Sequence, residues 1–318
     1  MVMRKLELPL SQTQKVRFER AIERLQSLSS TANSDTSVIV TGSIPVNHEE
    51  SFLKGHGTSE VDGELLATVC GVVERVDKLV YVRTLRARYK AETGDIVVGR
   101  VSEVAQKLWR VELNCTQDGV LKLSSMTTTD DVQRRRTSAD ELNMRNIFVE
   151  DDVVCAEVRT IQRDGTLELH ARSHKYGKLE KGLLLKVDPY LVRKSNHHFH
   201  YIESLGIDLI IGRNGFIWVG EHVQVRDPMM VDDQKSDTYD ADREQIHTSL
   251  ETRQSICRMG NAIRVLANLG FTVTLEVIME TANLSNSKNI DIHDMLGSEF
   301  HVVVAESEAE RRRAKRQK

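Results

Sequence analysis

The chain has 318 residues, of which 40% are hydrophobic and 29% are charged. This composition is typical of a folded globular protein and argues against full-length disorder, a collagen-like repeat or a membrane bundle. The 44 Lys and Arg residues against 47 Asp and Glu residues give a formal charge of -3. Because there is no overall basic excess to hold a polyanion, any contact with nucleic acid must be local or assisted by partners.

The four cysteines show no paired spacing of the kind found in zinc ribbons or redox motifs; they are Cys70, Cys115, Cys155 and Cys257. We expect reduced thiols and an intracellular compartment. Charged residues interrupt residues 1–10, where a secretory signal would be apolar, and no apolar run approaches the roughly 18 residues of a membrane helix. The sequence therefore predicts a protein that is neither secreted nor membrane-spanning.

In chain order, the first predicted element is a charged helix over 11–28 with Ser11 as its N-cap. Short β-branched runs separated by glycines follow from residue 38 and predict a small β domain. Five further strands predict an OB-type barrel; they are GDIVVGRVSEV, KLWRVEL, GVLKLSS, VVCAEVRTI and GTLELHARS. A polar insertion over 127–148 separates the third of these strands from the fourth and contains a helix candidate that starts at Ser138.

Beyond Tyr176 the pattern becomes mixed. GLLLKV, DLIIG and FIWVG predict strands, residues 240–269 predict a helix that stops at Gly270, and TVTLEVIME predicts another strand. We predict an α+β fold with five parts: a helical or flexible leader (1–37), an amino-terminal β domain (38–90), an S1-type OB barrel (91–175), a KH-like α/β domain (176–300) and a charged flexible tail (301–318).

The tetrapeptide Gly212, Arg213, Asn214 and Gly215 has two interpretations. In a KH domain a GXXG loop lets the backbone approach phosphates, because glycine removes the side-chain obstacle. Such a loop joins two helices, whereas β-like runs flank this one. A hairpin turn with Asn214 and Gly215 supplying positive φ is therefore the better interpretation.

Several segments together closely resemble the ribosomal-RNA-processing cap subunits of the RNA exosome. The resemblance runs from about residue 38 to 270 and is carried by KGHGT at 54–58, GVVERVDKLVYV at 71–82, GDIVVGRVSEV at 94–104, LKLSSM at 121–126, HARSHKYGKL at 170–179 and GRNGFIWVG at 212–220. The two ends of the chain diverge from that family. The resemblance implies a non-catalytic RNA-binding subunit that sits with two other cap proteins on a ring of six RNase-PH-like subunits, stabilises the ring and guides RNA into it for 3'-to-5' processing and degradation. It also implies no cofactor, no membrane, and residence in the nucleus, the nucleolus and the cytoplasm.

The resemblance also suggests site residues. The turn formed by Lys54, Gly55, His56, Gly57 and Thr58 would contact the ring. At the barrel positions where S1 domains usually carry a phenylalanine and a histidine, this chain has Arg110 and Lys122, so charge replaces base stacking. The alternation of the strand places the neighbouring Trp109 in the core or an interface.

The segment from His170 to His200 is locally basic, with seven Lys and Arg residues against two acidic ones. Arg172, Lys175 and Lys178 are therefore RNA-binding candidates, together with Gly212, Arg213, Asn214 and Gly215. A basic docking edge explains the same segment equally well. The histidines at 170, 174, 197, 198 and 200 have no nearby cysteine or carboxylate to complete a metal site, and none is expected.

No Walker loop, GxSxG elbow, HExxH motif or ordered carboxylate cluster is present, so we do not expect an enzyme. Three alternatives remain open: an exoribonuclease with appended RNA modules, a stand-alone RNA-binding regulator, and the related KH-containing exosome cap subunit. The segments KYGKL and KGHGT favour the ribosomal-RNA-processing cap subunit over the related KH-containing one.

Overall fold

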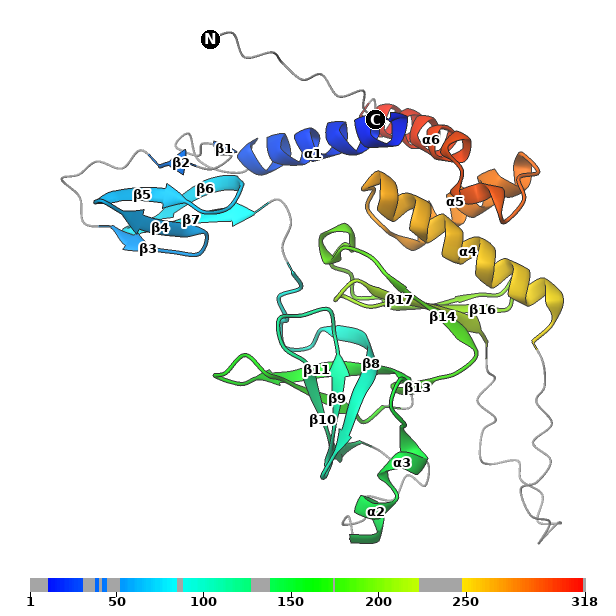
Figure 1. Cartoon of the computed structure of the whole chain (residues 1–318). Coiled ribbons are helices and arrows are strands. Elements are labelled where there is room, and N and C mark those ends of the chain that lie inside the picture. The colour runs from blue at the N-terminus through cyan, green and yellow to red at the C-terminus, as the bar shows by residue number, and fades with distance from the viewer. Residues whose placement is uncertain are drawn as a thin grey trace, which may run out of the picture. The chain divides into compact units, whose positions relative to one another are not determined.

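The computed structural model describes residues 11–30, 38–39, 42–44, 52–84, 88–126, 138–173, 175–222 and 248–316 (Figure 1). Contacts divide the chain into two compact units. One contains residues 1–87, 266–271 and 297–318, and the other contains residues 88–265 and 272–296. Within the described residues, no helix is both long enough and apolar enough to cross a membrane.

The first unit contains two long helices, α1 (Gln12–Ser30) and α6 (Ser298–Arg316), which contact each other. The start of α1 agrees with the predicted N-cap. The Gln14 backbone N–H donates to the Ser11 hydroxyl (3.3 Å), and the Ser11 N–H donates to the Gln14 side chain (2.9 Å). This reciprocal pair satisfies two of the backbone donors that a helix start leaves without partners.

Helix α6 contradicts one prediction, because residues 301–316 were expected to form a flexible tail. Phe300 and Val304 are 2% and 3% exposed, so the start of the helix is anchored in a core. The charged residues that follow are rich in Ala, Glu and Arg, which have high helix propensity. The composition of the last residues alone does not reveal that anchor.

The β domain of this unit has two small sheets around a core of Ile44, Leu65, Val73, Val80 and Val82. The first sheet has the order β1-β6-β7-β3 and consists of β1 (Val38–Ile39), β3 (Leu53–Lys54), β6 (Gly71–Val76) and β7 (Leu79–Thr84). The second has the order β2-β5-β4 and consists of β2 (Gly42–Ser43), β4 (Thr58–Val61) and β5 (Glu64–Ala67).

The second unit contains the five-stranded barrel. Its strands are β8 (Ile96–Ala105), β9 (Leu108–Glu112), β10 (Gly119–Met126), β11 (Val153–Ile161) and β12 (Leu167–Ala171). β8, β9 and β10 form an antiparallel meander, β12 pairs in parallel with β10, and β11 closes the barrel by pairing with both β12 and β8. The predicted OB barrel is confirmed.

The insertion between β10 and β11 contains two short helices, α2 (Ser138–Leu142) and α3 (Met144–Ile147), where one helix was predicted. It contributes to the barrel core through Phe148. The Trp109 indole, fully buried as predicted, makes an edge-on contact with the Phe148 ring at 5.3 Å between centroids. It also donates a hydrogen bond to the Phe148 carbonyl (3.2 Å).

The KH-like domain has an antiparallel sheet of order β14-β17-β16-β15. Its elements are β14 (Gly182–Lys186), the 3-10 turn η1 (Pro189–Leu191), β15 (Phe199–Ile202), β16 (Ile207–Ile211), β17 (Phe216–Glu221), α4 (Leu250–Leu269), α5 (Leu275–Ser287) and the 3-10 turn η3 (Asp294–Leu296). α4 approaches the sheet closely at Gly260, where a Cβ would lie 2.6 Å from a methyl of Leu183. The α+β fold class is confirmed.

Helix α5 contradicts a second prediction, since TVTLEVIME over 272–280 was expected to form a strand. Its buried residues are Val277, Ile278, Thr281, Ala282 and Ser285, which recur with helical periodicity. A strand-sized window contains too few residues to reveal that period. Only Val273 has a strand-like role, in an isolated bridge to Val192.

We expect Trp109→Ala to lower the free energy of unfolding of the barrel by about 3 to 5 kcal/mol, because it removes a fully buried ring and leaves the Phe148 carbonyl without its donor. Guanidinium denaturation followed by circular dichroism measures the loss. The neighbouring exposed substitution Arg110→Ala is the control, with an expected change within about 0.5 kcal/mol. Equal effects of the two would show that Trp109 does not support the core.

Candidate nucleic-acid interface

Residues 212–215 form the turn between β16 and β17. The predicted hairpin is present, and the Gly215 N–H donates to the Gly212 carbonyl (3.1 Å). Positive φ was expected at both Asn214 and Gly215, but only Gly215 has it, at +87°. Gly212, Asn214 and Gly215 are buried and Arg213 is half-buried. The structure therefore leaves this tetrapeptide little surface that RNA could contact, although the sequence analysis named all four residues as RNA-binding candidates.

The side chain of Asn214 is completely buried against the barrel. Its amide nitrogen donates to the carbonyls of Val98 (2.7 Å) and Leu113 (2.9 Å), and its amide oxygen accepts from the Val98 N–H (3.4 Å). The Asn114 side chain donates to the Asn214 carbonyl (3.1 Å). Both amide protons and the amide oxygen thus have barrel partners, which is what burial of a polar group requires.

An apolar contact extends this junction. Val98 and Cys155 of the barrel form one buried cluster with Ile210, Phe216 and Trp218 of the KH-like sheet. The Arg213 backbone N–H adds a hydrogen bond to the Ile96 carbonyl (2.9 Å), while its guanidinium donates to the Val192 carbonyl (3.0 Å). The barrel and the KH-like domain are therefore one packed unit, and residues 212–215 have a structural role in it.

We expect Asn214→Ala to destabilise this unit by about 2 to 4 kcal/mol, because it leaves three backbone groups of the barrel buried without partners. Chemical denaturation followed by tryptophan fluorescence in a Trp109→Phe background, where Trp218 at the junction is the remaining tryptophan, measures the effect. Asn114→Gly is the matched control: it removes one hydrogen bond at a residue with φ +57°, which glycine tolerates, and should cost about 1 kcal/mol. Equal losses for the two variants would contradict the role assigned to the Asn214 amide.

Cys155 offers a chemical probe of the same junction. Burial raises the pKa of its thiol to about 12, so the reactive thiolate is scarce at pH 8. Cys70 and Cys257 are exposed.

We expect an aromatic disulfide reagent at pH 8 to label Cys70 and Cys257 in the native chain and to label Cys155 only after unfolding. Peptide mass spectrometry reads out each site. Rapid native labelling of Cys155 would show that the junction opens in solution.

Arg110 and Lys122 lie on the outer surface of the barrel, on β9 and β10, as predicted. Each has an acidic neighbour that the sequence analysis missed. The Arg110 guanidinium lies 3.5 Å from the Glu103 carboxylate, and the Lys122 ammonium lies 3.0 Å from that of Glu168. The hydrogen bond from Lys122 lowers the pKa of Glu168, which keeps that pair ionised. This face of the barrel is charged but balanced.

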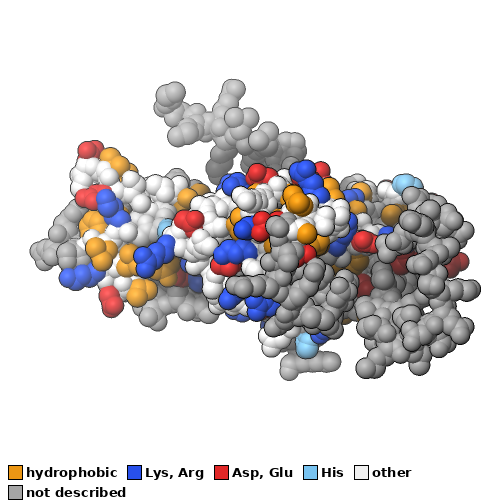
Figure 2. Space-filling model, turned by 90° about the horizontal axis from the view of Figure 1, so that it is seen from below, with side chains coloured by type: hydrophobic (Ala, Val, Ile, Leu, Met, Phe, Trp, Pro, Cys, Tyr) orange, Lys and Arg blue, Asp and Glu red, His pale blue; other side chains and the backbone are white. Residues whose placement is uncertain are grey.

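The basic segment 170–200 makes its described ion pairs with the barrel. Lys178 pairs with Asp152 (2.9 Å), Lys186 lies 3.9 Å from Glu112, and Lys194 pairs with Glu92. Part of the segment therefore serves as a docking edge, here against the chain's own barrel. Arg172 and Lys175 are exposed. In the view of Figure 2, basic side chains are scattered among acidic and hydrophobic ones over the described residues.

The turn over 54–58 is tightly built. The Thr58 hydroxyl donates to the Gly55 carbonyl (2.8 Å), and the Val82 N–H donates to the His56 carbonyl (2.9 Å). A Cβ on Gly55 would lie 2.6 Å from that of Tyr81, so only glycine fits there. Lys54, which lies 3.2 Å from Glu60, and His56 are exposed, and these are the side chains that the turn can offer to another protein.

The histidines do not gather into a site. His198 is buried with its Nδ1 at 2.8 Å from the Ile211 carbonyl, and His170 lies 3.7 Å from Glu157. His174 lies outside the described residues. Across the described ranges, no group of three His, Cys, Asp or Glu side chains is arranged to hold a metal ion.

An OB barrel joined to a KH-like sheet combines two kinds of module that are found in RNA-binding proteins. The comparisons agree: residues 88–160 match the RRP4-type S1 domain and residues 182–225 match the KH domain. The chain is 82% identical to the exosome complex component RRP4 homolog of Arabidopsis thaliana over the full length of both. It is 32% identical to exosome complex component RRP4 of Saccharomyces cerevisiae, covering 80% of this chain and 78% of that one, and 48% identical to the Bos taurus RRP4 over 55% and 59%. The chain belongs to the exosome complex component RRP4 family.

Proposed function

We propose that this protein is a non-catalytic RNA-binding cap subunit of the exosome, which stabilises the RNase-PH-like ring and guides RNA into it. The observation that carries the proposal is the full-length 82% identity to an exosome component, together with the S1 and KH modules. The cap would share a ring of six RNase-PH-like subunits with two other cap proteins. It would act in rRNA maturation and RNA turnover in the nucleus, the nucleolus and the cytoplasm.

For the ring contact we propose the turn over 54–58. Its fixed backbone presents Lys54 and His56 with little backbone entropy left to lose on binding, which favours a permanent interface. A tagged pull-down at about 150 mM salt tests the assignment. Recovery of six RNase-PH-like proteins and two other cap proteins near equal stoichiometry, with no nuclease activity in the isolated chain, is the expected result. A chain that degrades RNA alone would overturn it.

For RNA we propose the barrel face with Arg110 and Lys122, supported by Arg172 and Lys175. The ion pairs to Glu103 and Glu168 are partly exposed. Pairs of this kind contribute only about 0 to 1 kcal/mol, so a phosphate can displace the carboxylate at little cost. The overall charge of -3 implies that such contacts are few and that neighbouring subunits supply part of the affinity.

We expect Arg110→Glu combined with Lys122→Glu to reduce protection of RNA by the reconstituted exosome about tenfold or more while leaving the assembly intact, since two attractive contacts become repulsive. Nuclease protection of a single-stranded RNA, with size-exclusion chromatography alongside, measures both effects. Arg145→Glu combined with Arg264→Glu reverses two exposed cations elsewhere and is the matched control. Unchanged protection in the barrel variant would remove this face from the path of RNA.

A further inference from the structure

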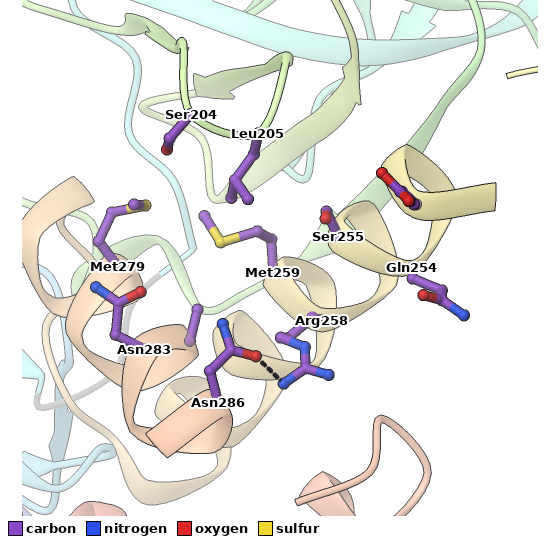
Figure 3. A pocket seen from close by; sticks show the side chains of 11 residues that line it. Ser204, Leu205, Gln254, Ser255, Arg258, Met259, Met279, Asn283 and Asn286 are labelled. Atoms are coloured by element: carbon purple, nitrogen blue, oxygen red, sulfur yellow. Dashed lines mark hydrogen bonds between the residues drawn. The ribbon is translucent and has the colours of Figure 1, made fainter. Parts of the chain in front are cut away.

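A pocket of about 220 Å³ lies between α4, α5 and the turn that joins β15 to β16 (Figure 3). Its floor is apolar and is made by Leu205, Met259, Met279 and Ala282. Met259 and Ala282 are almost fully buried, so the floor belongs to the core of the KH domain. The junction with the barrel uses none of these residues, and no role assigned above explains the pocket.

The rim of the pocket is polar. Asn283 and Asn286 stand one turn apart on α5, and Figure 3 shows the Asn283 amide beside Met279 and the Asn286 amide facing Arg258. Asn283 offers a hydrogen-bond donor and an acceptor on one group, which matches the polar edge of a nucleobase. The two sulfur-containing side chains come from different helices and suit the flat face of an aromatic ring.

Arg258 supplies a positive charge at this rim. Its guanidinium donates to the hydroxyl of Ser285 (3.1 Å) and to the amide oxygen of Asn286, as drawn in Figure 3. These partners orient the group without neutralising it, in contrast to Arg110 and Lys122 on the barrel. Glu251, the acidic residue of the rim, lies two helical turns away on α4, roughly 10 Å along the axis. A phosphate can therefore bind Arg258 without displacing a carboxylate.

We propose that this pocket holds one unpaired nucleotide of single-stranded RNA, with its base against Met259 and Met279, the edge of the base on Asn283, and a phosphate beside Arg258. The proposal rests on the RNA-binding function proposed above. An apolar peptide side chain would fill the floor but leave the Asn283 amide and the Arg258 charge without partners. A nucleotide uses all three features.

The test is a methyl NMR titration of the full chain with labelled methionines, using hexa-adenylate, hexa-uridylate and AMP as probes. The chain has nine methionines, and Met259→Leu and Met279→Leu assign the two pocket signals with little change in volume. We expect these two signals to shift saturably. Asn283→Asp, which removes the donors and repels phosphate, should weaken binding about fivefold or more.

Asn289→Asp is the matched control, because it makes the same chemical change at an exposed residue just beyond the end of α5. It should leave the affinity within about twofold, as expected for a surface substitution. Ribose 5-phosphate tests the base: shifts and affinity equal to those of AMP would mean that only phosphate binds, and would overturn the proposal.

Two further outcomes separate the pocket from the function as a whole. RNA that binds the chain without shifting Met259 or Met279 would reject the pocket and leave the RNA-binding function standing. Pocket signals that shift with the other exosome subunits and not with RNA would identify a protein-docking site and overturn the proposal. Absence of RNA binding by both the chain and the reconstituted exosome would reject the function and the pocket together.

Discussion

The buried amide of Asn214 is the constraint on which the S1–KH unit depends. Its three hydrogen bonds reach Val98 and Leu113, which lie 116 and 101 positions away in the sequence. An amide buried without partners costs several kcal/mol, so the junction is stable only in the register that gives this amide its barrel partners. Any surfaces that contact RNA on the two modules are therefore held in a fixed relationship.

The rigidity of this unit bears on how a slightly acidic chain can bind RNA. The basic side chains of the barrel face and of segment 170–200 face carboxylates such as Glu103, Glu168 and Asp152. These partly exposed pairs contribute little to stability, so in the proposed RNA contact a phosphate can replace the carboxylate at little cost. Binding by the isolated chain should therefore be weak. A rigid surface pays little entropy when it meets RNA, so it benefits fully from the effective concentration that an assembly provides.

The local features of this structure could be predicted from sequence, and those that depend on distant partners could not. Alternation identified the barrel strands and the buried Trp109, and the Asn214–Gly215 pair between two apolar runs indicated the hairpin. The pairing of Arg110 with Glu103 could also have been predicted, because a tight turn between β8 and β9 fixes that register. The pairing of Lys122 with Glu168 could not have been predicted, because it depends on the parallel pairing of β10 with β12 across a long insertion. The pocket was missed for the same reason: its methionines and asparagines come from segments that only the fold brings together, and α5 was taken for a strand.

The connection between α4 and α5 leaves this KH domain without a backbone clamp of the GXXG type. A clamp loop needs glycines on both sides so that its backbone can approach phosphates. Here the connection contains Gly270, whose positive φ ends α4, followed by the buried residues Phe271 and Val273. The Val273 N–H donates to the Leu191 carbonyl (2.9 Å), so this segment is fixed in the core and cannot open toward a phosphate. The glycines that resemble a clamp are used instead at the barrel junction. The polar groups that remain accessible on the two helices are side chains. Those of Arg258 and Asn283 line a pocket that has an apolar floor and a guanidinium held by uncharged partners.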